Sequence, residues 1–535
     1  MTRSSGTLIS YIDPDIYLEV DPSSSLEERV SQPNDMGIIQ RQGLKSSIVS
    51  YIGVAIGVLS TMYIYPSALE IIGLFRTLFD ASVLIGIVVM MGSSVSAVRF
   101  FPKYQDASTG HSGLLSWLLI VSGMGFLLFL MAYPLLKDWM VDFIFREDNR
   151  KYMDMVVYVI PLTFLLALIN LLSRYISNFK LIAVPSALEQ LTIKITLPLI
   201  VLAYLAGWIT VKGVVICIVA SFAFAALGMM YYLRYLGEFK LARPLIMKDK
   251  PALREYSWYA WFGILSGVGS QVAFRIDGLM VSSMIRFEAA GVYSISWALS
   301  DIIIKPMRSL ASIAAPLLAQ KIEDNKLDEV KVIYQKSSLN MTIIGAGLFF
   351  LIWTVLPYIF GLMANPDVMQ QGAYVVFFLG LAQVFDMMTG VNNEIISYSK
   401  YYRFTLYLTL FLAVINILAN LLFIPMYGLA GSALATCLSM FIFNIVKLVF
   451  IQVKFGFHPF SPRLIPAIGF CVASWLIARV LPETGSNAIN LFYKAGVFTM
   501  LYGLAIWRFH ISQDINHWID LGWGKIRKVV ARSEG

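Results

Sequence analysis

Long runs of apolar residues, separated by short polar connections, follow one another from about residue 46 to the end of the chain. A membrane-spanning helix needs about 20 consecutive, mainly apolar residues. The runs that reach this length lie near 46–68, 77–98, 113–135, 154–174, 182–206, 210–233, 257–283, 288–320, 337–363, 370–394, 404–424, 427–453, 464–481 and 489–507. The pattern therefore predicts an all-α integral membrane protein with about fourteen transmembrane helices.

The composition agrees with this prediction and excludes several classes of protein. Apolar residues make up 58% of the 535 residues, while charged residues make up 14%, against about 25% in soluble proteins. These values exclude a soluble enzyme and a nucleic-acid binder. The three cysteines and four histidines form no disulfide framework and no zinc-ligand spacing, so we expect no metal site and no cofactor.

The positions of the basic residues predict the topology. The two termini and the even-numbered connections hold 27 of the 41 Lys and Arg residues, the odd-numbered connections hold 8, and 6 fall within spans. Connections rich in Lys and Arg stay in the cytoplasm. We therefore expect both termini on the cytoplasmic side. The asymmetry also supports the number of spans, because one span more or fewer would distribute the Lys and Arg residues over both sides.

Short matches at a nearly constant offset indicate an internal duplication. Glu70–Phe75 recurs as Glu288–Tyr293 at an offset of 218, and Gly213 with Ser221 recurs as Gly431 with Ser439 at the same offset. Each half would hold six helices in the same orientation, which places a substrate path between the halves. The predicted parts are a polar tail at 1–45, a first six-helix bundle at 46–234, a basic linker at 235–256, a second bundle at 257–453, two added helices at 464–507 and an amphipathic basic tail at 508–535.

Charged residues inside the apolar runs are the candidates for chemistry, because a charge in the bilayer interior normally faces protein or water. Gln271 and Arg275 share one helix face, whereas Asp277 points elsewhere. Asp301, Lys305 and Arg308 form one stripe on the next span, with Pro306 as a candidate hinge within it. Arg275, Lys305 and Arg308 could neutralise a phosphate or pyrophosphate. Alternatively, Asp301 and Lys305 form a pair within their helix, and Arg275 pairs with Asp277 or with another helix.

Other polar residues in the runs suggest further roles. Asn392 and Asn393, with Gln271, could form hydrogen bonds with sugar hydroxyl groups. Asp386 and Asp301 are candidates for binding a coupling proton or Na⁺. We expect the long side chains of Lys447 and Lys494 to extend toward the membrane surface.

Several of these segments resemble a known family. The stretch Phe274–Met280, followed by Ala290–Ser294, is similar to a pattern of Wzx-type polysaccharide flippases, as is Pro425–Thr436 at the junction of helices 11 and 12. On these motifs the chain is identified as a member of the multidrug/oligosaccharidyl-lipid/polysaccharide (MOP) exporter superfamily. The resemblance implies two six-helix bundles and two further helices, with Arg275, Lys305 and Arg308 in a central cavity. The cations that some relatives carry in the first bundle have no clear match here, because the first two spans hold only Lys45 and Arg76, near their ends.

The resemblance and the residues together favour a flippase that moves a lipid-linked oligosaccharide across the cytoplasmic membrane of a bacterium by alternating access. Its partners would be this substrate, membrane lipids, H⁺ or Na⁺ as the coupling ion, and other polysaccharide-assembly proteins, with no nucleic acid. The alternative is a cation-coupled multidrug or small-metabolite antiporter of the same superfamily, and a glycan polymerase or glycosyltransferase ranks third. The external connections are short and the chain has no P-loop, so we expect no enzyme activity and no ATP hydrolysis.

Overall fold

The computed structural model describes residues 56–106, 110–145, 147–179 and 183–517, and the single positions 53, 181, 519 and 520. Every regular element among these residues is a helix, so the all-α fold predicted from the apolar runs is confirmed. The predicted polar tail at 1–45 and the end of the predicted basic tail, from residue 521, lie outside the described residues.

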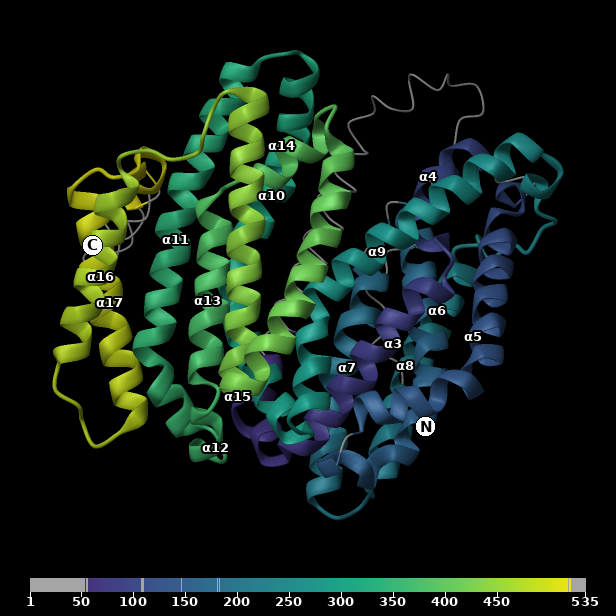
Figure 1. Cartoon of the computed structure of the whole chain (residues 1–535), viewed down its shortest axis with the longest axis horizontal. Helices are drawn as coiled ribbons and strands as arrows, with labels where there is room; N and C mark the ends of the chain where they lie inside the picture. The colour runs from purple at the N-terminus through teal and green to yellow at the C-terminus, as the bar shows by residue number, and fades with distance from the viewer. Residues whose placement is uncertain are drawn as a thin grey trace, which may run out of the picture.

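The first half of the chain forms one group of helices, drawn in purple to blue in Figure 1. Its main helices are α3 (Leu69–Val89), α4 (Ser93–Tyr104), α5 (Leu114–Ile144), α6 (Val159–Ser177), α7 (Ala183–Leu205) and α8 (Val211–Tyr235). Short π or 3-10 segments lie at η1 (Ser60–Ile64), η2 (Tyr65–Ala68), η3 (His111–Gly113), η4 (Glu147–Tyr158) and η5 (Leu245–Lys248). One continuous apolar core joins these helices.

The second half forms the other group, which ends in yellow in Figure 1. Its helices are α9 (Lys250–Met284), α10 (Phe287–Glu323), α11 (Leu327–Leu362), α12 (Pro366–Gln370), α13 (Ala373–Met388), α14 (Asn392–Tyr398) and α15 (Tyr402–Phe455). The added helices α16 (Leu464–Val480) and α17 (Asn487–Arg508) pack on the outside of this group, against α11.

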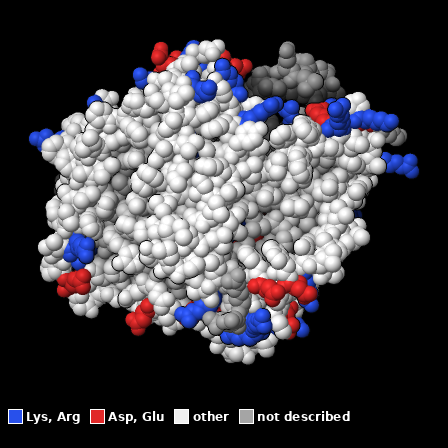
Figure 2. Space-filling view, in the orientation of Figure 1, with Lys and Arg blue, Asp and Glu red and all other residues white. Residues whose placement is uncertain are grey.

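The helices account for the fourteen predicted spans. Ten helical stretches among the described residues are long and apolar enough to cross a membrane. Two of these stretches, 56–89 and 402–455, each hold two predicted spans or parts of them, the latter divided by a kink at Gly428 (φ 57°). The helices α9 and α16 supply the remaining two spans. Charged side chains gather at the two rims of the molecule in Figure 2, with a broad uncharged band between them.

The second predicted span has the wrong boundaries. It was expected at 77–98, but α3 begins at Leu69, and the helix is interrupted at Met91 (φ 45°) and Gly92 (φ 76°) before α4 restarts. Arg76 therefore lies within α3 and not in a connection. The candidate hinge Pro306 lies inside α10, and the helix continues through it.

Helix α9 connects the two halves. Its first turns pack on the first half, where Tyr256 lies within 3.3 Å of the Ser93 hydroxyl and a Cβ atom on Gly92 would lie 2.5 Å from the Ala260 backbone. Its last turns contact α15 in the second half. The helix begins at Lys250, so the residues predicted as the end of the linker are helical.

The two halves cross closely where α3 and α10 begin. A Cβ atom on Gly73 of α3 would lie 1.8 Å from the carbonyl oxygen of Phe287, and one on Gly291 of α10 would lie 2.2 Å from that of Leu69. These glycines are equivalent residues of the predicted duplication, 218 positions apart. Each allows its helix to approach the start of the other, which is the relation expected of two halves repeated about one axis.

Two asparagine side chains strengthen this crossing. The Asn149 side chain donates a hydrogen bond to the Ser282 carbonyl (2.8 Å) and accepts one from the Phe287 amide (3.1 Å). The Asn365 amide donates to the Pro66 carbonyl (2.9 Å). We call this part of the molecule, at the bottom of Figure 1, the crossing end, and the opposite part, which carries residues 236–249, the linker end.

We predict that Gly73→Ala and Gly291→Ala each lower the thermal unfolding temperature of the purified protein, because the added methyl group overlaps backbone that cannot move aside. Overpacking of this kind costs about 1–3 kcal/mol. Gly496→Ala on α17 is the control, since nothing lies within 4 Å of its built Cβ and alanine favours a helix. Equal stability of all three variants would contradict the close crossing.

Candidate functional site

A buried carboxylate joins the two halves of the molecule. The Asp80 side chain on α3 is 1% exposed; its Oδ2 atom accepts a hydrogen bond from Arg76 Nε (2.6 Å), one turn earlier on the same helix. Its Oδ1 atom accepts one from Arg275 Nη1 (2.6 Å), on α9. The alternative in which Arg275 pairs with another helix is thus the arrangement observed.

Neighbouring side chains fix the orientation of both guanidinium groups. Gln271 Oε1 accepts a hydrogen bond from Arg275 Nε at 2.5 Å, as their shared face predicts. The Arg275 guanidinium carbon lies 5.5 Å from the ring centre of Phe79, and that of Arg76 lies 5.3 Å from Trp297 on α10, both within cation–π range. We call Arg76, Asp80, Gln271 and Arg275 the Asp80 cluster.

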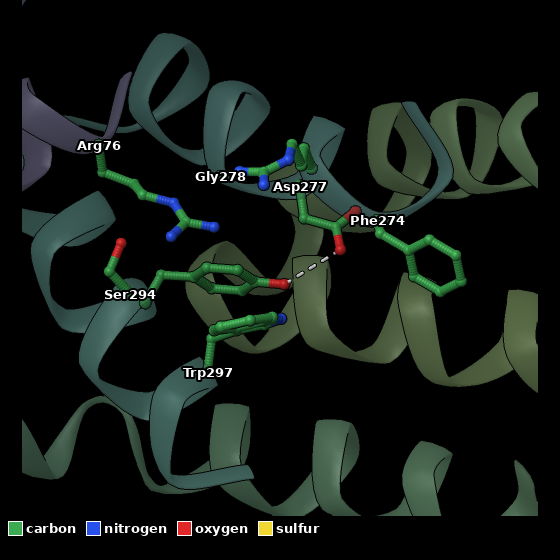
Figure 3. Close-up of a pocket in the computed structure, with 8 residues that line it drawn as sticks. Arg76, Phe274, Asp277, Gly278, Ser294 and Trp297 are labelled. Carbon is green, nitrogen blue, oxygen red and sulfur yellow. Dashed lines mark hydrogen bonds between the residues drawn. The ribbon is translucent and has the colours of Figure 1, made fainter. Parts of the chain in front are cut away.

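The Asp80 cluster borders a small pocket between α3, α9 and α10, shown in Figure 3. Arg76 extends toward Trp297 there, and the Tyr293 hydroxyl group donates a hydrogen bond to Asp277. An arginine has five N–H donors. Arg76 uses one of them on Asp80 and Arg275 uses two, so both retain donors for an anionic group.

Asp277 forms a second polar site, inside the second half. Its carboxylate is buried and accepts hydrogen bonds from Asn416 (2.9 Å), Asn420 (3.0 Å), Thr436 (2.7 Å) and Tyr293 (3.3 Å). Within the described part of the chain, no Lys or Arg side chain lies within ion-pair distance of it. These five residues are called the Asp277 cluster below.

The residues of the predicted stripe on α10 form an ion-pair network. Asp301, of which 9% of the side chain is exposed, lies 2.5 Å from Lys305 Nζ and accepts from Arg308 Nη2 at 2.8 Å. This is the predicted alternative of an intrahelical pair, extended to Arg308. Both cations are more than half exposed although they lie deep along a 37-residue helix, and Lys305 is within electrostatic reach of Lys194 on α7.

The remaining candidate residues lie elsewhere in the second half. Asn392 is buried and donates to Thr389 (2.8 Å) and Asn444 (3.3 Å), while Asn393 is exposed. Asp386 lies 3.8 Å from Lys447, whose side chain is 4% exposed. Lys447 therefore does not extend to the surface as predicted. The structure does not bring Asn392 or Asp386 into contact with the Asp80 cluster.

Of the residues in the two clusters, sequence reasoning named only Gln271 and Arg275 as site residues. It missed the other seven: Arg76, Asp80, Asp277, Tyr293, Asn416, Asn420 and Thr436. Signals for several of them were present. Arg76 and Asp80 have the four-residue spacing of a helical ion pair, and so do the polar side chains of Asn416 and Asn420 within an apolar run. The duplication held a further signal, because Glu288 was placed at the start of a span and its equivalent, Glu70, in a connection.

Comparison with known proteins gives consistent matches. The family model described as "Polysaccharide biosynthesis protein" matches residues 68–321, and the MatE model matches residues 263–422. The probable low-salt glycan biosynthesis flippase Agl15 of Haloferax volcanii is 20% identical over 234 residues. That match covers 43% of this chain and 47% of the relative, so the chain spans about half the length of the curated relative it matches.

Solved structures share the fold. The lipid II flippase MurJ in an inward closed conformation has a TM-score of 0.68 at 11% identity, with 88% of this chain and 98% of that one covered. An inward-facing multidrug resistance MATE family transporter of the MOP superfamily has a TM-score of 0.59 at 14% identity, with 76% and 94% covered. The fold expected from the sequence motifs is therefore confirmed, and the two family-model matches support the expected superfamily.

We predict that Asp80→Asn destabilises the protein by about 3–5 kcal/mol, because two guanidinium groups then face each other with no buried counter-charge. Combining it with Arg275→Gln should recover part of this loss, so the two effects are not additive. Thermal unfolding of the four proteins in the cycle measures the coupling. Asp367→Asn, at the exposed start of α12, is the control, and additive effects of Asp80→Asn and Arg275→Gln would contradict the pairing.

Proposed function

We propose that this chain is a flippase of the MOP superfamily that moves a lipid-linked oligosaccharide across the cytoplasmic membrane of a bacterium. The observation that carries the proposal is the Asp80 cluster, where guanidinium groups from both halves converge. The lipid end of the substrate would present a pyrophosphate, and arginine binds phosphate oxygens through paired N–H donors. The pyrophosphate would compete with Asp80 for these donors.

The charge distribution supports an orientation for this transport. The linker end carries the connections that are rich in Lys and Arg, including 235–256, so we assign it to the cytoplasm. The crossing end then faces outward. The contacts of Gly73, Gly291 and Asn149 at that end would close the path to the outside, and alternating access would require them to separate.

Lys305 and Arg308 would meet the substrate before the Asp80 cluster does. They lie eight and eleven residues beyond Trp297 on α10, which is about 12–16 Å along a helix, in the direction of the linker end. Charges at such depth face water or protein and not lipid, and these two are largely exposed. The pyrophosphate would therefore pass from an open pair of cations to a more enclosed pair.

Two of the three candidates for contact with sugar hydroxyl groups already have other hydrogen-bond partners. Gln271 already holds Arg275, so we assign it to positioning that guanidinium. Asn392 forms its hydrogen bonds within its own bundle. Asn393 is exposed and stays a candidate for contact with sugar hydroxyl groups.

We further propose that the coupling ion binds at the Asp277 cluster. A buried carboxylate without a cationic partner requires a proton or a metal cation. Carboxylate, amide and hydroxyl oxygens together suit a hard cation such as Na⁺. The earlier candidates Asp386 and Asp301 are less suitable, because Lys447 neutralises one and Lys305 with Arg308 the other.

The rival proposal is a cation-coupled multidrug antiporter, which the MatE match favours. A cationic drug would need acidic groups along its path. Of the charged residues described there, Arg76, Arg275, Lys305 and Arg308 are cationic, and two aspartates, Asp80 and Asp301, already pair with them. A third, Asp277, is held by neutral side chains of the second half. Resistance to cationic dyes on overexpression would favour the antiporter.

We predict that Arg275→Ala, in cells that lack the native copy, abolishes surface polysaccharide and accumulates its lipid-linked precursor. Removal of this guanidinium deletes the contact from the second half to the pyrophosphate. Immunoblots of surface glycan and extraction of the precursor measure the two effects. Arg403→Ala, at an exposed position, is the control, and normal export from well-expressed Arg275→Ala protein would contradict the role of Arg275.

For the coupling ion, we predict that Na⁺ raises the thermal unfolding temperature of the wild-type protein but not of Asp277→Asn, because only the native carboxylate supplies the charge that binds it. K⁺ at equal ionic strength is the control for screening. Asp386→Asn should keep the Na⁺ effect. An effect of Na⁺ that survives in Asp277→Asn, or is absent from the wild type, would contradict Na⁺ binding at this cluster.

A further inference from the structure

A second pocket, which shares no lining residue with the first, lies between α11 and the added helices α16 and α17. Its volume is about 400 Å³, in the range of small-molecule sites. Residues from the crossing end of these helices line it, with one wall from the start of α13; the aromatic ones are Trp353, Tyr358, Phe360 and Trp475, and the charged ones are Arg479, Glu483 and Lys494.

Two close helix contacts frame the pocket. A Cβ atom on Gly361 of α11 would lie 2.4 Å from the Asn487 side chain, and one on Gly347 would lie 2.9 Å from that of Tyr502. Both partners are on α17, and Lys494 lies between them in the sequence. Helices α11 and α17 are therefore closely packed at two levels, and the pocket lies where the two helices separate.

The charges of the pocket do not cancel. Lys494, with 3% of its side chain exposed, lies 3.3 Å from Glu483, and the Tyr358 hydroxyl donates to the same carboxylate at 2.5 Å. These two hydrogen bonds lower the pKa of Glu483, so it stays ionised and balances Lys494. Arg479 contacts the Trp475 ring at 5.4 Å, and no carboxylate of the described residues lies within ion-pair distance of it. One positive charge is left over.

The mouth and the deeper part of the pocket differ in chemistry. Arg479 is one residue from the end of α16, whereas Trp353 lies nine residues before the end of α11, roughly 14 Å into the helix. The mouth is thus cationic and the deeper part aromatic. Around it, α16 and α17 expose Ile477, Val480 and Phe492 by 51%, 84% and 75%, as expected of a surface that faces lipid.

We infer that this pocket binds an anionic phospholipid from the leaflet at the crossing end. Its phosphate lies against Arg479, whose planar guanidinium matches phosphate oxygens, and its glycerol and upper acyl chains lie against Trp475 and Trp353. The lipid fills the space between α11 and the added helices and holds these helices to α11. This inference does not depend on the transported substrate.

The test uses the full-length protein in detergent with phosphatidylglycerol, phosphatidylcholine, a polyprenyl phosphate or inorganic phosphate. Native mass spectrometry counts bound lipid, and thermal unfolding measures stabilisation. We expect phosphatidylglycerol to bind and stabilise most, and Arg479→Gln to weaken its binding about ten-fold, the effect of one charge-assisted contact. Arg508→Gln, exposed at the other end of α17, should leave it unchanged.

Several results would overturn the inference. These are equal binding of phosphatidylglycerol and phosphatidylcholine, preference for polyprenyl phosphate, stabilisation by inorganic phosphate alone, or an Arg479→Gln protein that binds as the wild type does. Arg479→Lys separates charge from misfolding: it should retain most of the preference for phosphatidylglycerol, and its loss in a stable Arg479→Lys protein would mean that the charge is not what selects the lipid.

Discussion

A single carboxylate, that of Asp80, neutralises guanidinium groups from both halves of the molecule. It is almost fully buried, so its own charge would be very unfavourable without Arg76 and Arg275. The two arginines in turn would repel each other without it. The relative position of α3 and α9 at this level is therefore tied to electrostatics. Nearer the crossing end, α3 is held against α10 by the contacts of Gly73 and Gly291.

This constraint explains how a polyanionic substrate could act on the fold. A pyrophosphate that reaches Arg76 and Arg275 would supply the negative charge that Asp80 now supplies. The two arginines would then be linked through the substrate and not through Asp80. When the substrate leaves, Asp80 would again pair with both arginines. Arg76 belongs to the first half and Arg275 to the second, so binding of the pyrophosphate would depend directly on the distance between the halves. The proposed cation site at Asp277 lies two residues beyond Arg275 in the sequence and shares a pocket with it, which provides a short physical route for coupling.

Much of the fold could be predicted from the sequence because apolar runs and basic connections are governed by the bilayer, which acts on every helix separately. The number of spans, the duplication and the stripe Asp301–Lys305–Arg308 all follow from such local patterns. Asp80 could not be identified as a site residue in this way. Its importance depends on Arg275, 195 residues later, and on a helix start at Leu69 that the charges of Glu70 and Arg76 conceal. The packing of the start of α9 on the first half likewise depends on the Gly92 contact, which no periodicity reveals.

The most direct test of the account is translocation by the purified protein alone. The protein would be reconstituted in liposomes with a fluorescent oligosaccharide on a polyprenyl pyrophosphate, and the labelled sugar exposed outside would be measured over time with a membrane-impermeant quencher. The account predicts that wild-type protein moves the labelled sugar between leaflets and that Arg76→Gln/Arg275→Gln protein, folded and inserted equally well, does not. Equal rates for the two proteins, or no movement by folded wild-type protein in the presence of both Na⁺ and H⁺ gradients, would contradict it.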